Sequence, residues 1–219
     1  MQLSGNSQNK AANAVLAIVN QFREHRVRTF TVLGGVIILA ALVFLIIARI
    51  QKYDVYASDK YSQGYGNIAA GNQAQGVAIL EDLIKVYPKT PASFEARLLL
   101  SEYNISIGNF SQSLIYLSEV ERNGNPKQIR PIGLYRMIAI YDQTNDIENA
   151  VNYSKIFVEK YKDSFLVKDT YMNLARFYLL KNSLEDARKT YTDIVAKFPA
   201  TEEAAISARI LEGFPQSQQ

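Results

Sequence analysis

Hydrophobic residues form one continuous run near the beginning of the chain and recur periodically in the rest of it. The run lies between Phe30 and Ala48 and contains no charged residue. An α-helix rises about 1.5 Å per residue, so a helix of this length crosses a hydrocarbon core about 30 Å thick. We therefore predict a single transmembrane helix over residues 30–49. Basic side chains flank it on both sides: Arg23, Arg26, Arg28, Arg49 and Lys52.

A cleaved signal peptide is the main alternative interpretation of this run. The apolar core of a signal peptide is usually about 7–15 residues long and is followed by a small-x-small cleavage site. The run in this chain is longer, and Ala48-Arg49-Ile50 makes a poor cleavage site. An uncleaved anchor is therefore favoured.

The residues before the run contain a second apolar pattern. Within residues 10–24, Val15, Ile18, Val19 and Phe22 lie at helical spacing and form one stripe. The stripe indicates either an amphipathic helix that binds the membrane surface or a partner, or an early start of the membrane helix. The pattern does not decide between these two interpretations. In either case, we expect residues 1–29 to form a short tail.

The charge of the chain divides unequally between the anchor and the rest. The formal net charge of +3 splits into +5 for residues 1–52 and −2 for residues 53–219. A nearly neutral domain argues against nucleic-acid binding, which needs a basic surface. Within about 15 residues of the run, the basic residues on the two sides balance, and Lys10 adds one to the N-terminal side. We expect the short tail to stay in the cytoplasm and the long domain to be exported.

The remainder of the chain repeats every 37 residues. Four two-residue motifs begin at Gly71, Gly108, Asn145 and Asn182, each 37 residues after the previous one. Gly and Asn tolerate the left-handed conformation that ends a helix. The Asn, Asp or Ser that follows can accept hydrogen bonds from the free amides of the next helix. Each motif therefore predicts the tight turn of a helix hairpin.

Apolar residues at helical spacing lie on both sides of each turn, which predicts four helix hairpins within residues 50–214. Proline follows three of the second helices, at Pro88, Pro126 and Pro199, and proline cannot continue a helix. No proline or glycine lies between Arg49 and Gln63, so we expect the membrane helix to continue into the first hairpin. The first helices are expected over residues 56–70, 92–107, 132–143 and 168–181, and the second over 73–87, 111–122, 147–161 and 184–198. The repeats cover about residues 57–93, 94–130, 131–167 and 168–204, followed by a capping helix over 204–214 and a tail over 215–219.

The fourth repeat carries the signature spacing of the tetratricopeptide repeat family. The matching residues are Tyr171, Leu174, Ala175, Tyr178, Ala187, Tyr191, Ile194 and Pro199. The chain resembles this family over roughly residues 55–214, although its 37-residue repeat is longer than the family's repeat of about 34. The resemblance implies an all-α fold. A single N-terminal transmembrane helix would precede a tetratricopeptide-repeat α-solenoid of about four hairpins and a C-terminal capping helix.

The layout of the whole chain is similar to a bacterial family, the ancillary subunits of the Sec translocon. Members have a short cytoplasmic tail, one membrane helix and a periplasmic tetratricopeptide-like domain. The likeness depends on the anchor being followed directly by tyrosine-rich repeats, and on residues 90–108. It implies a single-pass protein of the bacterial inner membrane with a periplasmic C-terminal domain. The implied partners are translocon or envelope-complex subunits, or exported clients.

The sequence offers little for catalysis or for binding a metal or cofactor. It has no cysteine, which excludes disulfides, thiolate catalysis and sulfur-ligated zinc. The one histidine, His25, belongs to the basic cluster before the membrane run, where we expect no metal. Gly64, Gly66, Gly71 and Gly76 lack the lysine of a phosphate-binding loop and indicate close helix packing and a turn. We therefore expect no enzyme activity, no cofactor and no small-molecule substrate.

The first helix of each repeat lines the concave groove of such a solenoid, and we expect partner proteins to bind there. Tyrosine suits this role because it offers a large contact area with a polar tip. The alternative is that these side chains pack within the repeats or face water. A clamp for the C-terminal carboxylate of a chaperone is not expected, because Tyr61, Tyr65 and Leu99 occupy its positions. The candidate groove residues are Tyr61, Tyr65, Glu102, Tyr135, Asp142, Gln143, Met172 and Arg176.

The sequence thus predicts a membrane-anchored scaffold that binds other proteins through the groove. Two alternatives stay open. The first is a receptor whose repeats face the cytosol. The second is an assembly protein whose tail and span drive oligomerisation while the repeats act as a spacer.

Overall fold

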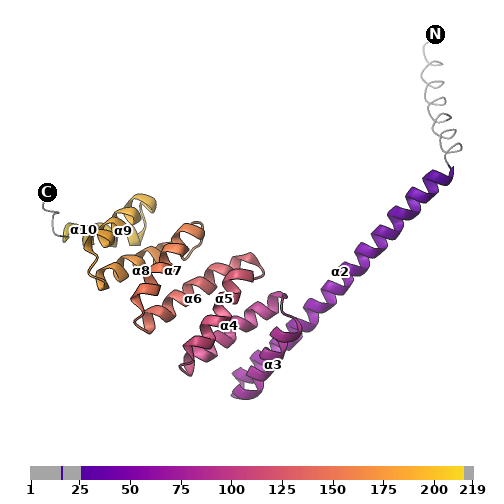
Figure 1. Cartoon of the computed structure of the whole chain (residues 1–219), viewed down its shortest axis with the longest axis horizontal. Coiled ribbons are helices and arrows are strands. Elements are labelled where there is room, and N and C mark those ends of the chain that lie inside the picture. The colour runs from indigo at the N-terminus through magenta and orange to yellow at the C-terminus, as the bar shows by residue number, and fades with distance from the viewer. Residues whose placement is uncertain (1–15, 17–25, 215–219) are drawn as a thin grey trace, which may run out of the picture. The chain divides into compact units, whose positions relative to one another are not determined.

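The computed structural model describes Leu16 and residues 26–214 of the 219-residue chain (Figure 1). Two sequence predictions lie outside the described residues. They are the apolar stripe of Val15, Ile18, Val19 and Phe22, and the place of His25 in the basic cluster before the apolar run. Residues 26–214 form helices and turns without a strand, which confirms the predicted all-α class. The α-helices are α2 (Arg26–Ala69), α3 (Gln73–Val86), α4 (Pro91–Ser106), α5 (Phe110–Asn123), α6 (Arg130–Gln143), α7 (Ile147–Lys160), α8 (Val167–Leu180), α9 (Leu184–Lys197) and α10 (Glu202–Glu212).

Helix α2 is continuous from Arg26 to Ala69. The chain divides into two compact units, residues 1–53 and residues 54–219, and the boundary between them falls within this helix. Among the described residues, the part Phe30–Ala69 is the one helical stretch that is long and apolar enough to cross a membrane. Its most apolar 18-residue window has a mean hydropathy of 3.0 and contains no buried residue. By length and composition it is a candidate membrane span, although a signal sequence would meet the same criteria.

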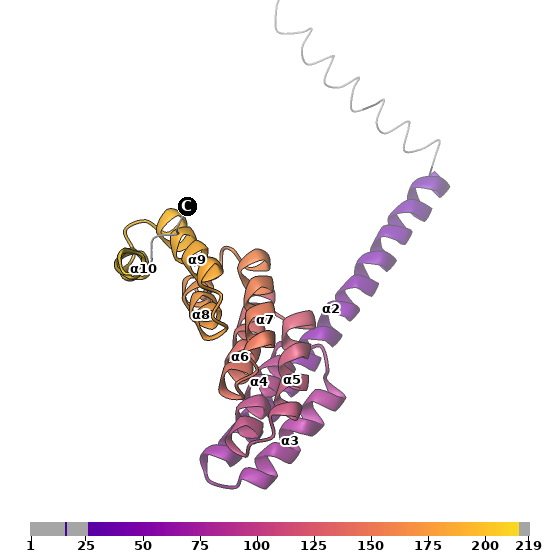
Figure 2. The same cartoon turned by 60° about the vertical axis from the view of Figure 1, so that its left-hand side comes forward.

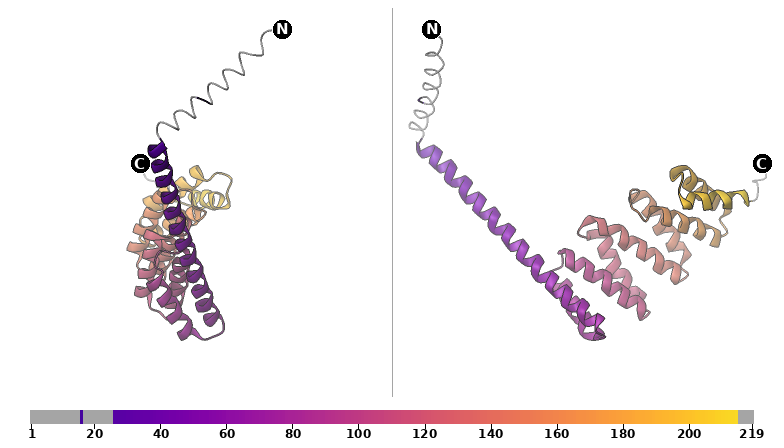
Figure 3. Two further views of the ribbon diagram at one scale, coloured as in Figure 1. Left: turned by 90° about the vertical axis from the view of Figure 1, so that its right-hand side faces the viewer. Right: turned by 180° about the vertical axis from the view of Figure 1, so that it is seen from behind.

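The second unit is a series of antiparallel helix hairpins that follow one another in chain order (Figures 1 and 2). Helix α4 packs against α5, α6 against α7, and α8 against α9, while α10 covers α9. A short 3₁₀ helix, η1 (Lys127–Ile129), precedes α6. The views in Figure 3 show the same succession from α3 to α10. This arrangement is the predicted α-solenoid of four hairpins with a final helix.

The turns of the four hairpins have the predicted left-handed residue. The φ angles of Gly71, Gly108, Asn145 and Asn182 are 87°, 74°, 56° and 57°. The residue after each of them donates its backbone amide to a carbonyl five positions earlier, for example Asn109 to Asn104 at 2.7 Å. This bond satisfies a carbonyl in the last turn of the preceding helix. The 37-residue period in the sequence therefore marks the positions at which the first helix of each hairpin ends.

The residue after the left-handed position caps the next helix in two of the four turns. The side chains of Asn109 and Asp146 accept hydrogen bonds from the amides of Gln112 and Asn149 at 3.4 and 3.2 Å. Asn72 and Ser183 make no such side-chain bond. The prediction of a cap in every turn is wrong for these two, where the backbone alone closes the turn.

The helices of the repeat domain end close to the predicted positions. From α3 to α10 every helix begins and ends within two residues of its expected range. The first expected helix, residues 56–70, has no separate beginning because α2 already contains it. The predicted continuity between the apolar run and the first hairpin is therefore confirmed, since both belong to the one helix α2.

The core follows the same 37-residue period. One position on the second helix of each hairpin is fully buried in all four repeats, namely Leu83, Val120, Phe157 and Ile194. A second position carries a small buried residue in every repeat, namely Gly76, Ser113, Ala150 and Ala187. Large residues fill the space between helices, and small residues allow two helices to approach closely.

The approach is closest between α2 and α3. A Cβ atom added to Gly76 would lie 2.7 Å from the carbonyl oxygen of Gly64 and 2.9 Å from the backbone nitrogen of Ile68. A Cβ atom added to Gly64 would lie 2.6 Å from a methyl carbon of Leu80. The predicted role of these glycines in close helix packing is therefore visible in the geometry. The two helices are also joined by an ion pair between Lys60 and Asp82.

Candidate functional site

The candidate groove residues all lie on α2, α4, α6 and α8, the first helices of the four hairpins. We call the surface that they share the first-helix face. It is defined by Tyr61, Tyr65, Glu102, Tyr135, Asp142, Gln143, Met172 and Arg176. Six of these side chains contact another first helix or one another.

Two ion pairs link successive first helices. Arg176 on α8 donates two hydrogen bonds to Asp142 on α6, at 3.1 and 2.6 Å. Arg136 on α6 forms an ion pair with Glu102 on α4, with 2.6 Å between Nη1 and a carboxylate oxygen. The middle of the first-helix face is thus crossed by charges that neutralise one another.

Arg136 was not among the residues predicted from the sequence. A signal for it exists, because Arg136 follows Glu102 by 34 residues, the same separation that joins Arg176 to Asp142. A search for opposite charges at a fixed separation slightly shorter than the repeat would have found both pairs. The side chains of both pairs are between 32% and 53% exposed, so each pair contributes little to stability by itself, about 0–1 kcal/mol.

Tyr61 and Tyr65 form an aromatic pair at the α2 end of the face. Their ring centroids are 6.3 Å apart and their planes differ by 22°. Tyr61 packs partly against the core, whereas 54% of Tyr65 is exposed. Burial raises the pKa of the Tyr61 hydroxyl, and the negative charges of Glu95 and Glu102 on α4 raise it further. The tyrosine pair and the two carboxylates are therefore close neighbours.

Tyr135 lies at the same repeat position as Tyr61, two repeats further along the chain. Its ring packs edge-on against Phe157 of α7, with 6.3 Å between the centroids. Burial raises the pKa of Tyr135, and the charge of Asp169 on α8 adds to this effect. A hydrogen bond with Asn173 acts in the opposite direction. The hydroxyl of Tyr135 thus faces α8, the next first helix.

Met172 and Gln143 have different surroundings from the rest. Met172 is half-buried, packs against the core, and accepts a hydrogen bond at its sulfur from Ser207 of α10 at 3.5 Å. Its role in packing is therefore evident. Gln143 is the exposed last residue of α6.

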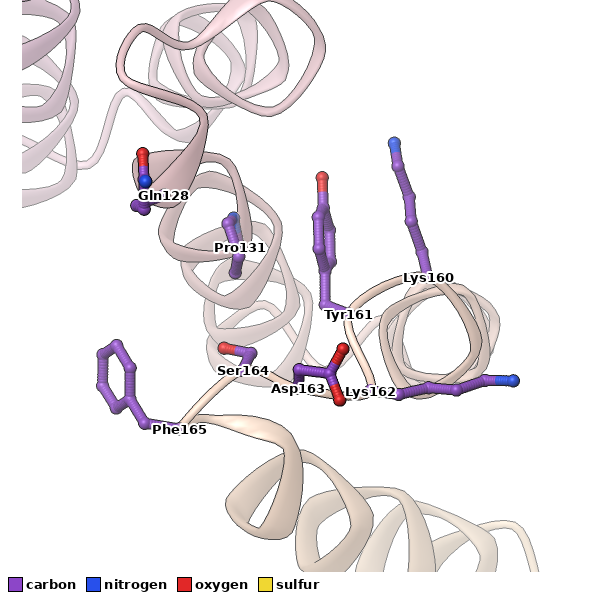
Figure 4. A pocket seen from close by; sticks show the side chains of 8 residues that line it. All are labelled: Gln128, Pro131, Lys160, Tyr161, Lys162, Asp163, Ser164 and Phe165. Atoms are coloured by element: carbon purple, nitrogen blue, oxygen red, sulfur yellow. The ribbon is translucent and has the colours of Figure 1, made fainter. Parts of the chain in front are cut away.

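A separate hollow of about 370 Å³ lies beside the loop that joins α7 to α8 (Figure 4). The ring of Phe165 borders it and is 76% exposed. The Tyr161 hydroxyl on another side of the hollow donates to Glu121 at 3.0 Å. None of the candidate groove residues belongs to this hollow. Its lining residues are Gln128, Pro131, Lys160, Tyr161, Lys162, Asp163, Ser164 and Phe165.

The part of the chain that the structure describes contains no cluster of three or more His, Cys, Asp or Glu side chains that could hold a metal ion. The polar and aromatic contacts in it include the two ion pairs and the stacked rings of Tyr141 and Tyr153. What the first-helix face offers is a surface of aromatic rings, carboxylates and paired charges. Such a surface is suited to binding another molecule.

The fold and this surface define a helical repeat protein of the kind that binds other proteins. The model of a tetratricopeptide repeat-like domain matches residues 28–212. The chain therefore belongs to the tetratricopeptide repeat-like domain family. The family match does not single out the ancillary subunits of the Sec translocon.

Solved structures agree with the fold. One is the crystal structure from Podosopora anserina of nearly identical TPR-like repeats of a candidate kinesin light chain. It has a TM-score of 0.50 and 15% identity and covers 70% of this chain and 82% of its own. A single-substitution variant of that protein has a TM-score of 0.52 and 14% identity, and covers 73% and 84%. At this identity the likeness concerns the fold alone. No curated protein matches the chain.

Proposed function

We propose that this protein is a membrane-anchored scaffold that binds partner proteins through the first-helix face of its repeats. The single observation that supports this most is the stacked aromatic pair of Tyr61 and Tyr65 beside carboxylates on that face. Tyr65 is 54% exposed, and tyrosine is a residue enriched in protein interfaces.

The anchoring part of the proposal is supported by the exposure of α2. Every large apolar side chain from Phe30 to Ile47 is between 47% and 70% exposed. A continuous apolar surface of this size is unfavourable in water and favourable in lipid. The proposal therefore assigns the residues from Phe30 to Ala48 to the hydrocarbon core.

The location and partners belong to the same proposal. The resemblance to the ancillary Sec subunits supports a bacterial inner-membrane protein with its repeats in the periplasm. The partners would then be translocon or envelope-complex subunits, or exported clients. The anchor raises the local concentration of the repeats near such membrane partners.

Affinity capture from detergent-solubilised membranes tests the binding part. We expect the full chain to retain specific proteins, identified by mass spectrometry, and a variant with Tyr61→Ala, Tyr65→Ala and Tyr135→Ala to lose them. Ile115→Ala on α5 is the matched control, because Ile115 is 59% exposed on a second helix. Circular dichroism should show that both variants keep the helical content of the wild type. Equal capture by the triple variant and the control would favour a spacer role for the repeats.

A reporter fused after Gln219 tests the topology. The proposal expects alkaline phosphatase to be active there, since that enzyme needs the periplasm. Activity only from a reporter that works in the cytoplasm would instead support the receptor that faces the cytosol.

A further inference from the structure

The first-helix face carries a second pattern with a period of two repeats. One repeat position holds a tyrosine in the first and third repeats and an apolar residue in the second and fourth. The residues at this position are Tyr61, Leu98, Tyr135 and Met172. Another position holds a carboxylate in the second and fourth repeats and no charge in the first and third. The residues at this position are Ser58, Glu95, Ile132 and Asp169.

Packing of each repeat on the next brings these two positions together. The separation of 34 residues that joins Glu102 to Arg136 and Asp142 to Arg176 across successive first helices also relates Tyr61 to Glu95 and Tyr135 to Asp169. In agreement, the charges of Glu95 and Asp169 raise the pKa values of these two tyrosine hydroxyls. Between them, the same separation of 34 residues relates Leu98 to Ile132, which are both half-buried and apolar. The face therefore alternates between a tyrosine–carboxylate seat and an apolar seat.

The two carboxylates of these seats differ from the other acids of the face. Glu102 and Asp142 are neutralised by Arg136 and Arg176. Glu95 and Asp169 are exposed, and neither has an ion pair or a side-chain hydrogen bond to another described residue. The face consequently keeps two uncompensated negative charges, each beside a tyrosine ring.

We propose that the first-helix face binds an extended segment of a partner protein that carries two basic side chains with an apolar residue between them. This inference rests on the proposed scaffold function and names the chemistry of the partner. Each Lys or Arg would lie against the tyrosine of one seat and pair with its carboxylate. The apolar residue would pack on Leu98 and Ile132.

Typical helix packing sets the spacing expected between the basic residues. With about 10 Å, the usual distance between packed helices, for each step from one first helix to the next, two repeats separate the seats by about 20 Å. An extended segment in the polyproline II conformation advances about 3.1 Å per residue with three residues per turn, so two basic residues about six residues apart span this distance and point to the same side as the residue midway between them. The apolar residue lies about halfway between them.

The energetics explain why two seats are needed. An exposed ion pair contributes about 0–1 kcal/mol, and a cation over a tyrosine ring contributes about 0.5–1 kcal/mol at an exposed site. One seat alone would bind weakly. Two seats on one face add their contributions and also select the spacing. The surplus negative charge disfavours nucleic acids and anionic lipid headgroups as occupants of this face.

Peptide binding to the full chain in detergent micelles tests the inference. The probe is a fluorescein-labelled peptide of Gly, Ala and Ser with two arginines about six residues apart and a leucine midway. A peptide of the same composition with its arginines about three residues apart is the comparison. We expect the first peptide to bind at least about fivefold more tightly by fluorescence anisotropy, because only it reaches both seats.

Variants of the seats complete the test. Glu95→Gln and Asp169→Asn should each weaken the first peptide about fivefold and remove the preference for its spacing. Glu159→Gln on α7, an exposed carboxylate of a second helix, should change neither. The inference is overturned if the two peptides bind equally, or if Glu95→Gln and Asp169→Asn bind the first peptide like the Glu159→Gln control.

The scaffold proposal has a separate readout. If the Tyr61, Tyr65 and Tyr135 variant loses its membrane partners while the peptides show no spacing preference, the scaffold function stands and the partner chemistry is wrong. If capture of membrane partners is unaffected by that variant, the scaffold proposal itself fails at this face, whatever the peptides do.

Discussion

Single residues decide how closely α2 and α3 approach each other. A Cβ atom on Gly76 would meet a side-chain carbon of Ile68 at 2.5 Å, and behind it two backbone atoms, the carbonyl oxygen of Gly64 at 2.7 Å and the nitrogen of Ile68 at 2.9 Å. Backbone atoms cannot rotate away as a side-chain end can. The pair of glycines therefore sets the helix separation, and the sequence suggests this only through the proximity of several glycines.

We predict that Gly76→Ala destabilises the repeat domain by about 1–3 kcal/mol, because the added methyl group forces the two helices apart. Urea unfolding of the full chain in detergent, followed by circular dichroism, measures this change. Gly66→Ala is the control, since nothing lies within 4 Å of a Cβ at that position. Alanine favours a helix over glycine by about 1 kcal/mol, so Gly66→Ala should leave stability equal or higher. Equal losses in both variants would contradict the packing argument.

The fold disfavours the ionisation of several tyrosine hydroxyls, because it raises their pKa values. Burial raises the pKa of Tyr141 to about 12, and the neighbouring Tyr153 adds to this effect. The two rings are stacked at 5.0 Å with a 12° angle between their planes. Burial is also the largest cause of a raised pKa at Tyr61, Tyr116, Tyr135, Tyr161, Tyr178 and Tyr191.

We predict that the protein loses stability in alkaline solution. The pKa of tyrosine in an unfolded chain is about 10, so a raised folded pKa means that the folded state holds the neutral hydroxyl. The stabilisation is therefore complete below about pH 10 and is lost as pH rises through the folded values, about 12 for Tyr141. Urea midpoints at about pH 9 and pH 11 measure the effect. Tyr141→Phe should make the loss less steep, and an unchanged midpoint in the wild type would refute the prediction.

The hairpin turn is the element that the sequence specifies best. Asn145 occupies the left-handed position with a φ of 56°, and Gly71 and Gly108 occupy it in the first two repeats. A side chain with a Cβ pays about 1–2 kcal/mol for this conformation unless it is Asn or Asp. Glycine in the first two repeats and asparagine in the last two therefore meet the same conformational requirement.

We predict that Asn145→Ala destabilises the domain by about 1 kcal/mol, whereas Asn145→Gly does not. Alanine lacks the polar side chain that tolerates the left-handed region, and glycine already fulfils the role elsewhere in the chain. Thermal unfolding of the two variants beside the wild type compares them directly. A larger loss for glycine than for alanine would show that the Asn145 side chain matters through another contact.

Helix ends could be predicted from the sequence because left-handed residues stop the helices at fixed intervals. Contacts between helices could not be predicted in the same way. The pairing of Arg136 with Glu102 depends on the offset between neighbouring repeats, which no residue in a single helix reveals. The exposure of Phe165 depends on the path of the loop between α7 and α8. The contact between Met172 and Ser207 of α10 is also a contact between helices, so the sequence did not reveal that Met172 packs in the core and differs in this from the other candidate groove residues.

At the scale of the whole molecule, the chain combines two parts that treat their apolar residues differently. The repeats bury their apolar residues in two core clusters, whereas α2 exposes every large apolar side chain from Phe30 to Ile47. The positive charge belongs to residues 1–52 and the small negative charge to the remainder. The hydrophobic pattern alone predicts both surfaces. For the site, the sequence predicts only the positions. Which of its carboxylates are neutralised depends on ion pairs between helices, and the sequence of a single helix does not reveal them.

We predict that Leu39→Arg together with Leu42→Arg abolishes membrane association of the full chain. Each leucine lies in the apolar run and is more than half exposed, at 63% and 52%. An arginine near the centre of a membrane helix costs about 2.5–3.5 kcal/mol on insertion scales, so two arginines offset much of the gain from the apolar run. Alkaline extraction of membranes, followed by immunoblotting, should find the wild type in the pellet and the variant in the supernatant. Leu39→Phe with Leu42→Phe keeps the run apolar and should stay in the pellet. Extraction of the wild type would contradict the anchor. Detection of only a shortened product that lacks residues 1–48 would show that the apolar run is a cleaved signal peptide.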